Sequence, residues 1–419
     1  MRMILVIMLM CHSLFAFTLE EVEQRAKDFN IDIAIEKNVL QSSKQNFDAQ
    51  KLKRYGEVEL FSTYTKYDSK RTLKPLSPPI SSNIATSKDI ANVGVSYSVV
   101  LFNGFSDTRD INVANIQNEL QISMITLTTN QVLYHVRSIY LDILSLKNQK
   151  NAQMQYRKSL ERLKQNISQE ISLGKRAKVD LFKVEADLQS TISEIGQMQS
   201  NINILKSSLG VLMNYEDDFD VVDNIPFKDK ELIDSKSYFK NIENTSYYKL
   251  SKFNQEKSSN EYEKSKASYY PKVLANTQYT KVYSADGDED SMWQAGLCLN
   301  WKIFDFTRTN KLVQKAKINQ IKSSLELEKT KLELKQKIIA ALNTIQLNKE
   351  AYIRAQKELS FSQQTVKIEK IRYEQEAIDI YNYLDANGKN EIVKAKQISA
   401  KYNLIKSYYY FEYILEESK

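Results

Sequence analysis

Hydrophobic and polar residues alternate in two segments of the chain, and each segment runs directly into a long helical stretch. The apolar residues of the first segment are Val93, Val95, Tyr97, Val99 and Leu101, with Gly94, Ser96 and Ser98 lying between them. In the second segment Trp293, Ala295, Leu297, Leu299, Trp301 and Ile303 alternate with Gln294, Gly296, Cys298, Asn300 and Lys302. Alternation with a period of two predicts β-strands that have one apolar and one polar face.

The helical stretches have apolar residues at steps of three and four. One series comprises Val184, Leu188, Ile195, Met198, Ile202, Leu205, Leu209 and Leu212, and a second comprises Ile318, Ile321, Leu325, Leu332, Ile339 and Leu342. A repeat of 3.5 residues predicts helices that wind around one another with a left-handed supercoil. Residues 106–172 and 307–373 contain no proline, so each stretch can form one helix about 100 Å long.

The strand and helix pattern occurs twice in the chain. Phe102 and Phe304 end the two alternating segments and lie 202 residues apart. The same offset relates Gly174 to Glu376 and Asp180 to Asn382, where one long helix is expected to give way to the next. A constant offset over this distance predicts an internal duplication.

Each predicted unit contains a short helical stretch, a pair of strands and a pair of long helices. The first unit, residues 17–213, has strands at about 57–67 and 91–103 and long helices at about 106–172 and 177–213. The second unit, residues 246–419, has strands at about 271–283 and 293–304 and long helices at about 307–375 and 380–415. The short helical stretches are expected at about 19–54 and 246–268, and the loops between strands at about 68–90 and 284–291.

The N-terminus has the layout of a cleavable secretory signal. Arg2 precedes an apolar run that is too short to span a bilayer stably, and Ala16 provides a small residue for cleavage. We therefore predict a signal peptide over residues 1–16, with a buried N-terminal helix as the alternative. Met10 is not the small residue that lipoprotein processing prefers before a cysteine, so Cys11 is not expected to be lipidated.

The composition argues against most enzymatic functions. Beyond the predicted signal peptide, Cys298 is the only cysteine and His135 the only histidine, so an internal disulfide or a Cys/His zinc site is not expected. Phosphate-binding sequences of the types GxxxxGK[ST] and GxGxxG are absent. We expect no catalytic site, no cofactor and no metal. The net charge of +7 comes from interspersed lysines and acidic residues, a pattern typical of solvated helix faces and not of a nucleic-acid surface.

The number of strands has a consequence for assembly. A soluble sandwich and a membrane sheet fit the strand pattern equally well, and the long helices favour the membrane sheet because a compact domain does not need them. In hydrocarbon, the edges of a four-stranded sheet would leave backbone groups without hydrogen bonds. Two copies would supply eight strands and three copies twelve, and about eight strands leave an interior filled by side chains. A pore therefore favours twelve strands.

The duplicated unit, the sequences LFNGF (101–105) and IFDF (303–306), and YLDA (383–386) resemble the TolC-like outer-membrane efflux protein family. The resemblance covers nearly all of the mature chain. It implies a mainly α-helical fold with membrane β-structure, in which a homotrimer forms a twelve-stranded β-barrel joined to a twelve-helix coiled-coil tunnel in the periplasm. It also implies a passive exit duct for a tripartite efflux or type I secretion system. The partners would be a periplasmic adaptor, an inner-membrane pump or ABC exporter, and outer-membrane lipid.

Two other classes of function stay open at this stage. A periplasmic coiled-coil adaptor or scaffold would also contain a helical hairpin, although such proteins usually have only one, flanked by β-rich domains. An exported hydrolase is disfavoured because the sequence has no pocket-like loop region. Residues 214–245 form a plain linker or, by the resemblance, part of a collar midway along the helices. The substrate stays open between drugs, metal ions and secreted proteins.

The resemblance also indicates which residues form the periplasmic entrance. The gate residues would be Asp180, Tyr373, Ile378, Asn382 and Asp385, and the helix turns would contain Gly174 and Glu376. Three Asp385 carboxylates would form a cation-attracting ring, unless Asp385 only starts a helix or lies on a solvated face. The barrel lumen would be lined non-specifically by Gln294, Asn300 and Lys302, and Trp293 and Trp301 would belong to the aromatic girdles of the membrane.

Three positions depart from the family pattern. Glu376 replaces the second turn glycine, so this turn is not expected to need a left-handed conformation. Asn382 replaces the outer acid of a pair, and Ile378 replaces an arginine that bonds across the closed entrance. A Tyr373–Asp180 hydrogen bond remains compatible with the sequence. We expect the entrance to be held more weakly than in the family, or by apolar contacts around Ile378 and Ile380.

Overall fold

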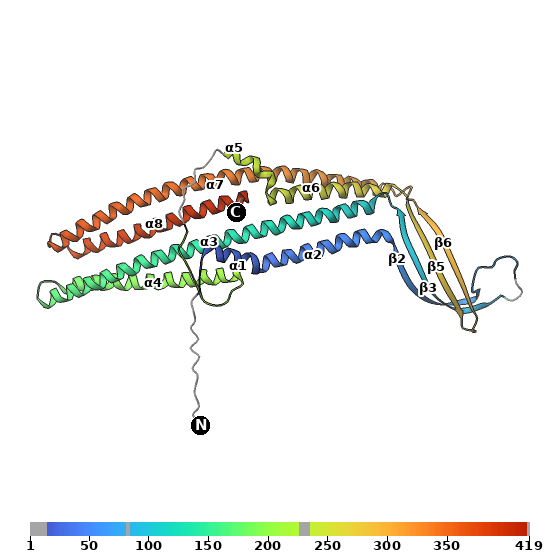
Figure 1. Cartoon of the computed structure of the whole chain (residues 1–419), viewed down its shortest axis with the longest axis horizontal. Helices are drawn as coiled ribbons and strands as arrows, with labels where there is room; N and C mark the ends of the chain where they lie inside the picture. Colours follow the sequence, from blue (N-terminus) through green and yellow to red (C-terminus); the bar gives the residue numbers. More distant parts are fainter. Residues whose placement is uncertain (1–14, 81–83, 226–234, 417–419) are drawn as a thin grey trace, which may run out of the picture. The chain divides into compact units, whose positions relative to one another are not determined.

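The computed structural model describes residues 15–80, 84–225 and 235–416 (Figure 1). The predicted signal peptide therefore lies outside the described residues except for Phe15 and Ala16. These two residues begin strand β1 (Phe15–Phe17), which pairs in parallel with β4 (Phe219–Val221).

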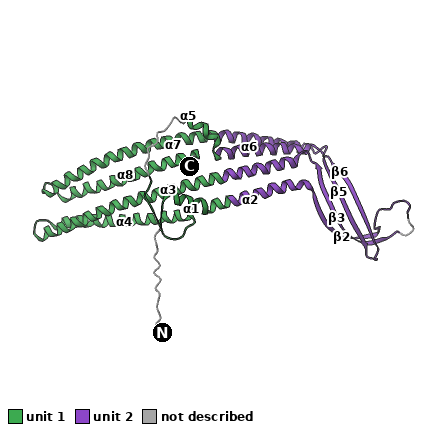
Figure 2. Ribbon diagram, in the orientation of Figure 1, with its two compact units in different colours: residues 1–36, 125–246, 331–419 green, residues 37–124, 247–330 purple. Residues whose placement is uncertain are grey.

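The chain divides into two compact units (Figure 2). Unit 1 comprises residues 1–36, 125–246 and 331–419, and unit 2 comprises residues 37–124 and 247–330. Each unit combines segments from both halves of the sequence, so each half of the predicted duplication contributes to both units.

The four long helices follow the internal offset of the sequence. Helices α3 (Ser106–Ser172) and α7 (Arg308–Glu374) both contain 67 residues, and α4 (Lys178–Met213) and α8 (Ile380–Leu415) both contain 36. Each end of α7 and α8 lies 202 residues after the matching end of α3 and α4. The left-handed backbone positions follow the same offset in four pairs, 104/306, 105/307, 174/376 and 214/416. This agreement supports the predicted duplication.

Antiparallel pairs of long helices form two hairpins, α3/α4 and α7/α8. In the first hairpin Lys164 lies 2.8 Å from Glu185, and Gln153 donates a hydrogen bond of 3.1 Å to Glu194. In the second hairpin an ion pair of 2.7 Å joins Lys396 to Glu358. No described helix combines the length and the apolar character needed to cross a membrane.

Short helices precede the strands. The stretch predicted at about 19–54 forms two helices, α1 (Leu19–Phe29) and α2 (Ile31–Leu52), with a 3-10 turn after α2. Asn30 separates them: its side-chain oxygen accepts hydrogen bonds from the backbone N–H groups of Asp32 and Ile33, as a helix N-cap does. In the second half, α5 (Ser235–Tyr238) and α6 (Ser246–Ser265) precede the strands.

Unit 2 contains a four-stranded antiparallel sheet. Its strands are β2 (Glu57–Thr72), β3 (Thr86–Phe102), β5 (Lys272–Ser284) and β6 (Glu289–Asn300), in the order β2-β3-β5-β6. The central pair, β3 and β5, joins the two halves of the sequence in one sheet, and β2 and β6 lie at its edges.

The bounds of three strands correct the sequence prediction. Strand β2 continues to Thr72 and β3 already begins at Thr86, where a loop was expected over residues 68–90. Strand β6 begins at Glu289 and ends at Asn300, so residues 301–304 are not strand. Backbone pairing explains the extensions, because the ladder continues through polar pairs such as Lys66 with Asp89. Side-chain alternation does not mark such polar ends.

The two faces of the sheet differ in polarity as the alternation predicted. One row across the strands consists of Leu60, Val95, Tyr279 and Trp293, and the neighbouring row on the opposite face consists of Glu59, Ser96, Gln278 and Gln294. The apolar face is open: Leu60, Trp293 and Leu297 are 79%, 76% and 74% exposed. A single copy of the chain therefore leaves a broad apolar surface uncovered.

The core of unit 1 joins α1, α3, α4, α8 and the small β1/β4 sheet. Tyr140 on α3 is fully buried, and its hydroxyl lies 2.6 Å from the Val222 carbonyl oxygen and 3.0 Å from that of Phe17. Arg137 forms two hydrogen bonds to the Glu23 carboxylate, of 2.6 and 3.1 Å, and lies 3.5 Å from Glu412. These contacts fix the short N-terminal helix against the long helices.

The Arg137–Glu23 ion pair is largely buried, with side chains 9% and 15% exposed. Replacing Arg137 by Gln would leave a buried carboxylate without its charged partner, so we expect the free energy of unfolding to fall by about 3–5 kcal/mol. The matched control is Lys164→Gln on the same helix, which breaks the exposed pair with Glu185 and should cost about 1 kcal/mol or less. Denaturant unfolding of the purified protein measures both, and equal losses would contradict the prediction.

Candidate functional site

A hydrophobic cluster in unit 1 brings the ends of the two long hairpins together. Its buried members are Tyr156, Leu160 and Ile167 of α3, Val184 and Leu188 of α4, Tyr373 of α7, and Ile380 and Leu384 of α8. Ile378 is partly buried against this group, which we call the hairpin-end cluster. The structure thus places Tyr373, Ile378 and Ile380 in one group, as the sequence interpretation of an apolar contact region requires.

The two hairpin turns have the same geometry. Gly174 and Glu376 both adopt left-handed backbone angles, with φ of 72° and 61°. In the first turn the N–H groups of Gly174 and Lys175 donate to Ile171 and Glu170, at 3.0 and 2.8 Å.

In the second turn Glu376 and Ala377 donate to Tyr373 and Arg372 at the same two distances. The expectation that Glu376 would release this turn from the left-handed conformation is therefore wrong. These paired hydrogen bonds satisfy the last carbonyl groups of the helix. They hold the backbone in place even where a side chain makes this conformation costly.

Tyr373 takes part in the cluster through its ring and not through its hydroxyl. The side chain is only 6% exposed, and within the described structure its hydroxyl has no hydrogen-bond partner. The Tyr373–Asp180 hydrogen bond that the sequence allowed is thus not formed. Burial raises the pKa of the Tyr373 hydroxyl above its ordinary value, and Arg176 opposes this shift. The ring lies parallel to that of Tyr383, with centroids 5.5 Å apart and an interplanar angle of 9°.

Arg176 is the main residue at the hairpin ends that the sequence did not indicate. It lies between α3 and α4, and its guanidinium carbon is 4.6 Å from the centre of the Tyr373 ring. Its Nε donates a hydrogen bond of 2.9 Å to Glu170. A basic residue two positions after the turn glycine was visible in the sequence, but nothing in its spacing indicated Tyr373 as a partner.

Asn382 and Asp385, which stand where the family resemblance expects an acidic pair, make separate local contacts. Asp385 carries a 42% exposed side chain, and its carboxylate lies 2.7 Å from the Lys389 ammonium. The alternative that Asp385 starts a helix is wrong, because Asp379 is the N-cap of α8 and accepts a 3.0 Å hydrogen bond from the Asn382 N–H. Asp385 instead lies on an exposed helix face with a compensating charge beside it.

Further acidic groups lie near the hairpin-end cluster. Burial raises the pKa of the Asp187 carboxyl, while the hydrogen bond from Tyr156 opposes the shift. Burial also raises the pKa of Glu391, which Lys394 opposes. Raised carboxyl pKa values mean that burial favours the protonated forms. The penalty for burying these carboxylates is therefore largest above their folded-state pKa values and disappears as the pH falls below their unfolded-state values.

The predicted lumen and girdle residues lie on unit 2. Gln294 and Asn300 belong to the polar face of the sheet, opposite Gln278 and Lys272, respectively. Trp293 belongs to the apolar face. Lys302 and Trp301 lie beyond the end of β6, where the Trp301 indole donates a 3.1 Å hydrogen bond to the Tyr269 carbonyl oxygen.

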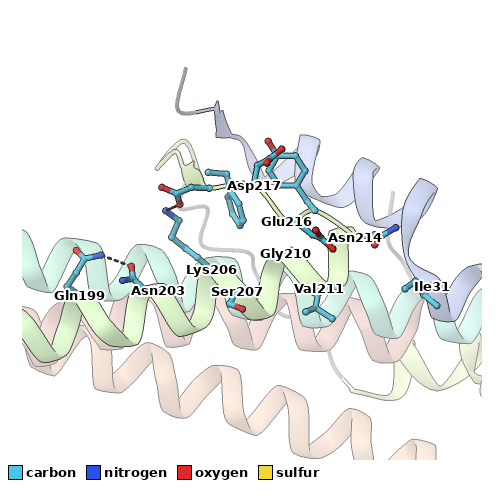
Figure 3. A pocket seen from close by; sticks show the side chains of 13 residues that line it. Ile31, Gln199, Asn203, Lys206, Ser207, Gly210, Val211, Asn214, Glu216 and Asp217 are labelled. Atoms are coloured by element: carbon cyan, nitrogen blue, oxygen red, sulfur yellow. Dashed lines mark hydrogen bonds and ion pairs between the residues drawn. The ribbon is translucent and has the colours of Figure 1, made fainter. Parts of the chain in front are cut away.

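A groove of about 800 Å³ lies on another part of unit 1 (Figure 3). It is bordered by α4 and by residues 214–219, including Asn214, Glu216 and Asp217. Lys206 forms an ion pair of 2.7 Å with Asp218 at this groove. The following strand inserts Phe219 and Val221 into the core, so this part of segment 214–245 is packed structure and not a plain linker. The described residues contain no group of three or more His, Cys, Asp or Glu side chains that could hold a metal ion.

Comparisons with known proteins find a family model and solved structures that this chain resembles. Residues 249–409 match the family model described as outer membrane efflux protein. The fold matches the crystal structure of CusC, described as forming a transmembrane channel, with a TM-score of 0.81 and 13% identity over 96% of this chain and 92% of that chain. No curated protein sequence matches the chain.

Two further solved structures show the same fold. A membrane protein from Pseudomonas aeruginosa matches with a TM-score of 0.83 and 15% identity, covering 96% of this chain and 91% of that one. The Campylobacter jejuni CmeC outer membrane channel matches with a TM-score of 0.79 and 13% identity, covering 95% and 85%. At these identities the structures show a shared fold.

The geometry of the two turns generates a test of backbone strain. A side chain at a left-handed position costs about 1 kcal/mol, so Glu376→Gly should slow local hydrogen exchange at residues 374–378 about fivefold. Gly174→Ala should accelerate exchange at residues 172–176 by a similar factor, because an added Cβ meets nothing within 4 Å and only the backbone conformation is penalised. Glu376→Ala removes the carboxylate but keeps the Cβ, and should leave the rate unchanged. If Glu376→Ala changed the exchange rate as much as Glu376→Gly does, the carboxylate charge and not backbone strain would control exchange at this turn.

Proposed function

We propose that this chain, whose residues 249–409 match the outer membrane efflux protein family model, is a member of that family and one subunit of a passive exit duct across the periplasm and the outer membrane. The family match and the channel fold support an efflux duct. In this proposal the chain has no catalytic role. Its signal peptide, residues 1–16, directs export, and substrates are chosen by the inner-membrane component.

The two-faced sheet with open edges is the observation that carries this proposal. Strands β2 and β6 each have one neighbour among the described strands, so each presents a second row of backbone groups for pairing. The apolar face is exposed along the sheet, and the opposite face has polar central rows such as Glu59, Ser96, Gln278 and Gln294. Lipid can cover the first face and water can fill a space along the second. Edge-to-edge pairing of three copies closes the sheet into a twelve-stranded β-barrel.

The spacing of the tryptophans fits this arrangement. Trp293 and Trp301 lie eight residues apart, on β6 and just beyond its end. At 3.4 Å per residue, eight residues span at most about 27 Å along a strand, and the strand tilt of about 35–45° in outer-membrane barrels reduces this to about 19–22 Å across the membrane, comparable with their apolar band of about 25 Å. Leu297 lies midway between them on the apolar face and would face the centre of the bilayer.

The long helices also support an assembly of several copies. Part of the heptad series on α7 is exposed in a single copy, namely Ile318, Ile321, Leu325, Leu332 and Ile339. A stripe of this kind is the usual packing surface of a coiled coil. In the proposal, helices of neighbouring copies cover it, and three copies build a twelve-helix periplasmic tunnel. A periplasmic adaptor and an inner-membrane pump or ABC exporter complete the export system.

The competing function is a periplasmic coiled-coil adaptor or scaffold. It would account for the helical hairpins but not for an exposed apolar sheet face between aromatic residues. An adaptor would be recovered as a soluble periplasmic protein. Membrane fractionation separates the two proposals, because a channel subunit stays with the outer membrane and its heat-labile trimer runs as such on a gel.

Placing the same charge on either face of β6 tests which face meets lipid. An arginine at the bilayer midplane costs about 2–4 kcal/mol, so Leu297→Arg should strongly reduce the amount of protein assembled in the outer membrane. Cys298 follows Leu297 in β6, is exposed, and lies on the opposite face of the sheet. Cys298→Arg introduces the same side chain on the opposite face, which would face the lumen, and should assemble like the parent protein. Equal assembly of the two variants, or loss of both, counts against the proposed orientation.

The Asp385–Lys389 pair predicts the ion selectivity of the entrance. Lys389 compensates the Asp385 charge at 2.7 Å, so Lys389→Gln should unmask a ring of three carboxylates and increase the preference for cations. The reversal potential in a KCl gradient measures this shift. Adding Asp385→Asn to Lys389→Gln should return the reversal potential toward that of the parent protein. A shift that persists in the double variant would assign selectivity to other residues.

A further inference from the structure

We infer that Arg176 is the latch of the periplasmic entrance, joining the two hairpins of each subunit by stacking its guanidinium group on the ring of Tyr373. This inference rests on the proposed function for its consequence in a channel. The contact itself is a property of the single chain. It differs from the lock implied by the family resemblance, which needs an arginine at the position of Ile378 and a hydrogen bond from the Tyr373 hydroxyl.

The latch consists of three stacked groups from three elements. Arg176 follows α3, Tyr373 is near the end of α7, and Tyr383 is in the first turns of α8. The Arg176 guanidinium carbon lies 4.6 Å from the centre of the Tyr373 ring, and the Tyr383 ring lies parallel on Tyr373 with centroids 5.5 Å apart. The first hairpin thus contacts the second through Arg176, while Tyr383 supports Tyr373 within the second hairpin.

Glu170 holds the latch residue in position. Its carboxylate accepts a 2.9 Å hydrogen bond from the Arg176 Nε, and the Arg176 side chain is only 16% exposed. A single orientation of the guanidinium plane follows, since the planar group cannot turn without breaking this bond. Partial removal from water strengthens the attraction between the cation and the face of the ring.

The hydroxyl of Tyr373 does not contribute a hydrogen bond to the closure. It is buried without a hydrogen-bond partner among the described residues, so the ring is the part of Tyr373 that carries the contact. Ile378 packs beside the stack in the hairpin-end cluster. An apolar residue at this position therefore supports the stacked groups from the side, and the cation is supplied by the other hairpin.

Opening of the entrance requires the hairpins to separate, which removes the guanidinium group from the ring. Loss of a partly desolvated cation–π contact of this kind shifts an equilibrium about tenfold. Arg176→Leu and Tyr373→Leu should each increase the open probability of single channels in planar bilayers by about this factor. Arg176→Lys keeps the charge but lacks the planar group, and should give a smaller increase.

Two variants distinguish the stacked latch from a lock based on the Tyr373 hydroxyl and from a general effect of positive charge at the turn. Tyr373→Phe keeps the ring, so its effect should be well below that of Tyr373→Leu, whereas a hydroxyl lock predicts equal effects. Lys175→Leu removes the neighbouring exposed cation of the same turn and should leave the channel closed. The double variant Arg176→Leu/Tyr373→Leu should open no more than either single variant, because both remove the same contact.

Hydrogen exchange provides a readout that does not depend on conduction. Exchange at residues 172–180 and 373–380 should accelerate about tenfold in Arg176→Leu and stay unchanged in Lys175→Leu. Unchanged exchange in Arg176→Leu, or equal opening by Tyr373→Phe and Tyr373→Leu, would overturn the latch. Accelerated exchange without conductance in any variant would support the latch and count against the proposed duct.

Discussion

The backbone hydrogen bonds of the sheet edges are the constraint on which the rest of the structure depends. Strands β2 and β6 each pair along one side with another described strand, and the face between them is apolar and exposed. Water can satisfy an open edge, but hydrocarbon cannot. A sheet with this apolar face can enter a membrane only if another chain pairs with its edges. In the proposed function, the assembly of several copies around a pore meets this requirement, and the same assembly covers the exposed α7 stripe.

The two hairpins have helices of equal length and turns of the same backbone geometry, but different side chains. Their helices end at matching positions, and both turns use a left-handed residue with the same pair of hydrogen bonds. The side chains then make the hairpins complementary: the first provides the Arg176 cation, and the second provides the Tyr373 and Tyr383 rings. The two turns thus share one backbone frame, while their different side chains make the contact between the hairpins.

Much of the fold was predictable from periodicity. Alternation located the four strands, and the absence of proline with a regular offset located the four long helices. The polar ends of β2 and β3 escaped prediction because ladder pairing there does not depend on side-chain polarity. The pairing of β3 with β5 is a long-range contact that local patterns do not encode. At the hairpin ends, the resemblance indicated Tyr373 and Ile378, which the structure places in the hairpin-end cluster. It did not indicate Arg176, because a stacking contact leaves no spacing signal, nor the left-handed Glu376, because backbone hydrogen bonds override the preference of a single residue.

The copy number in the membrane tests the central claim most directly. Native mass spectrometry of the protein extracted from outer membranes, without chemical cross-linking, measures it for the intact assembly. Closure of a four-stranded sheet into a pore predicts three copies of the 419-residue chain, less the signal peptide. A monomer in the outer-membrane extract would contradict the account, because a single sheet would then persist in lipid with both edges unpaired.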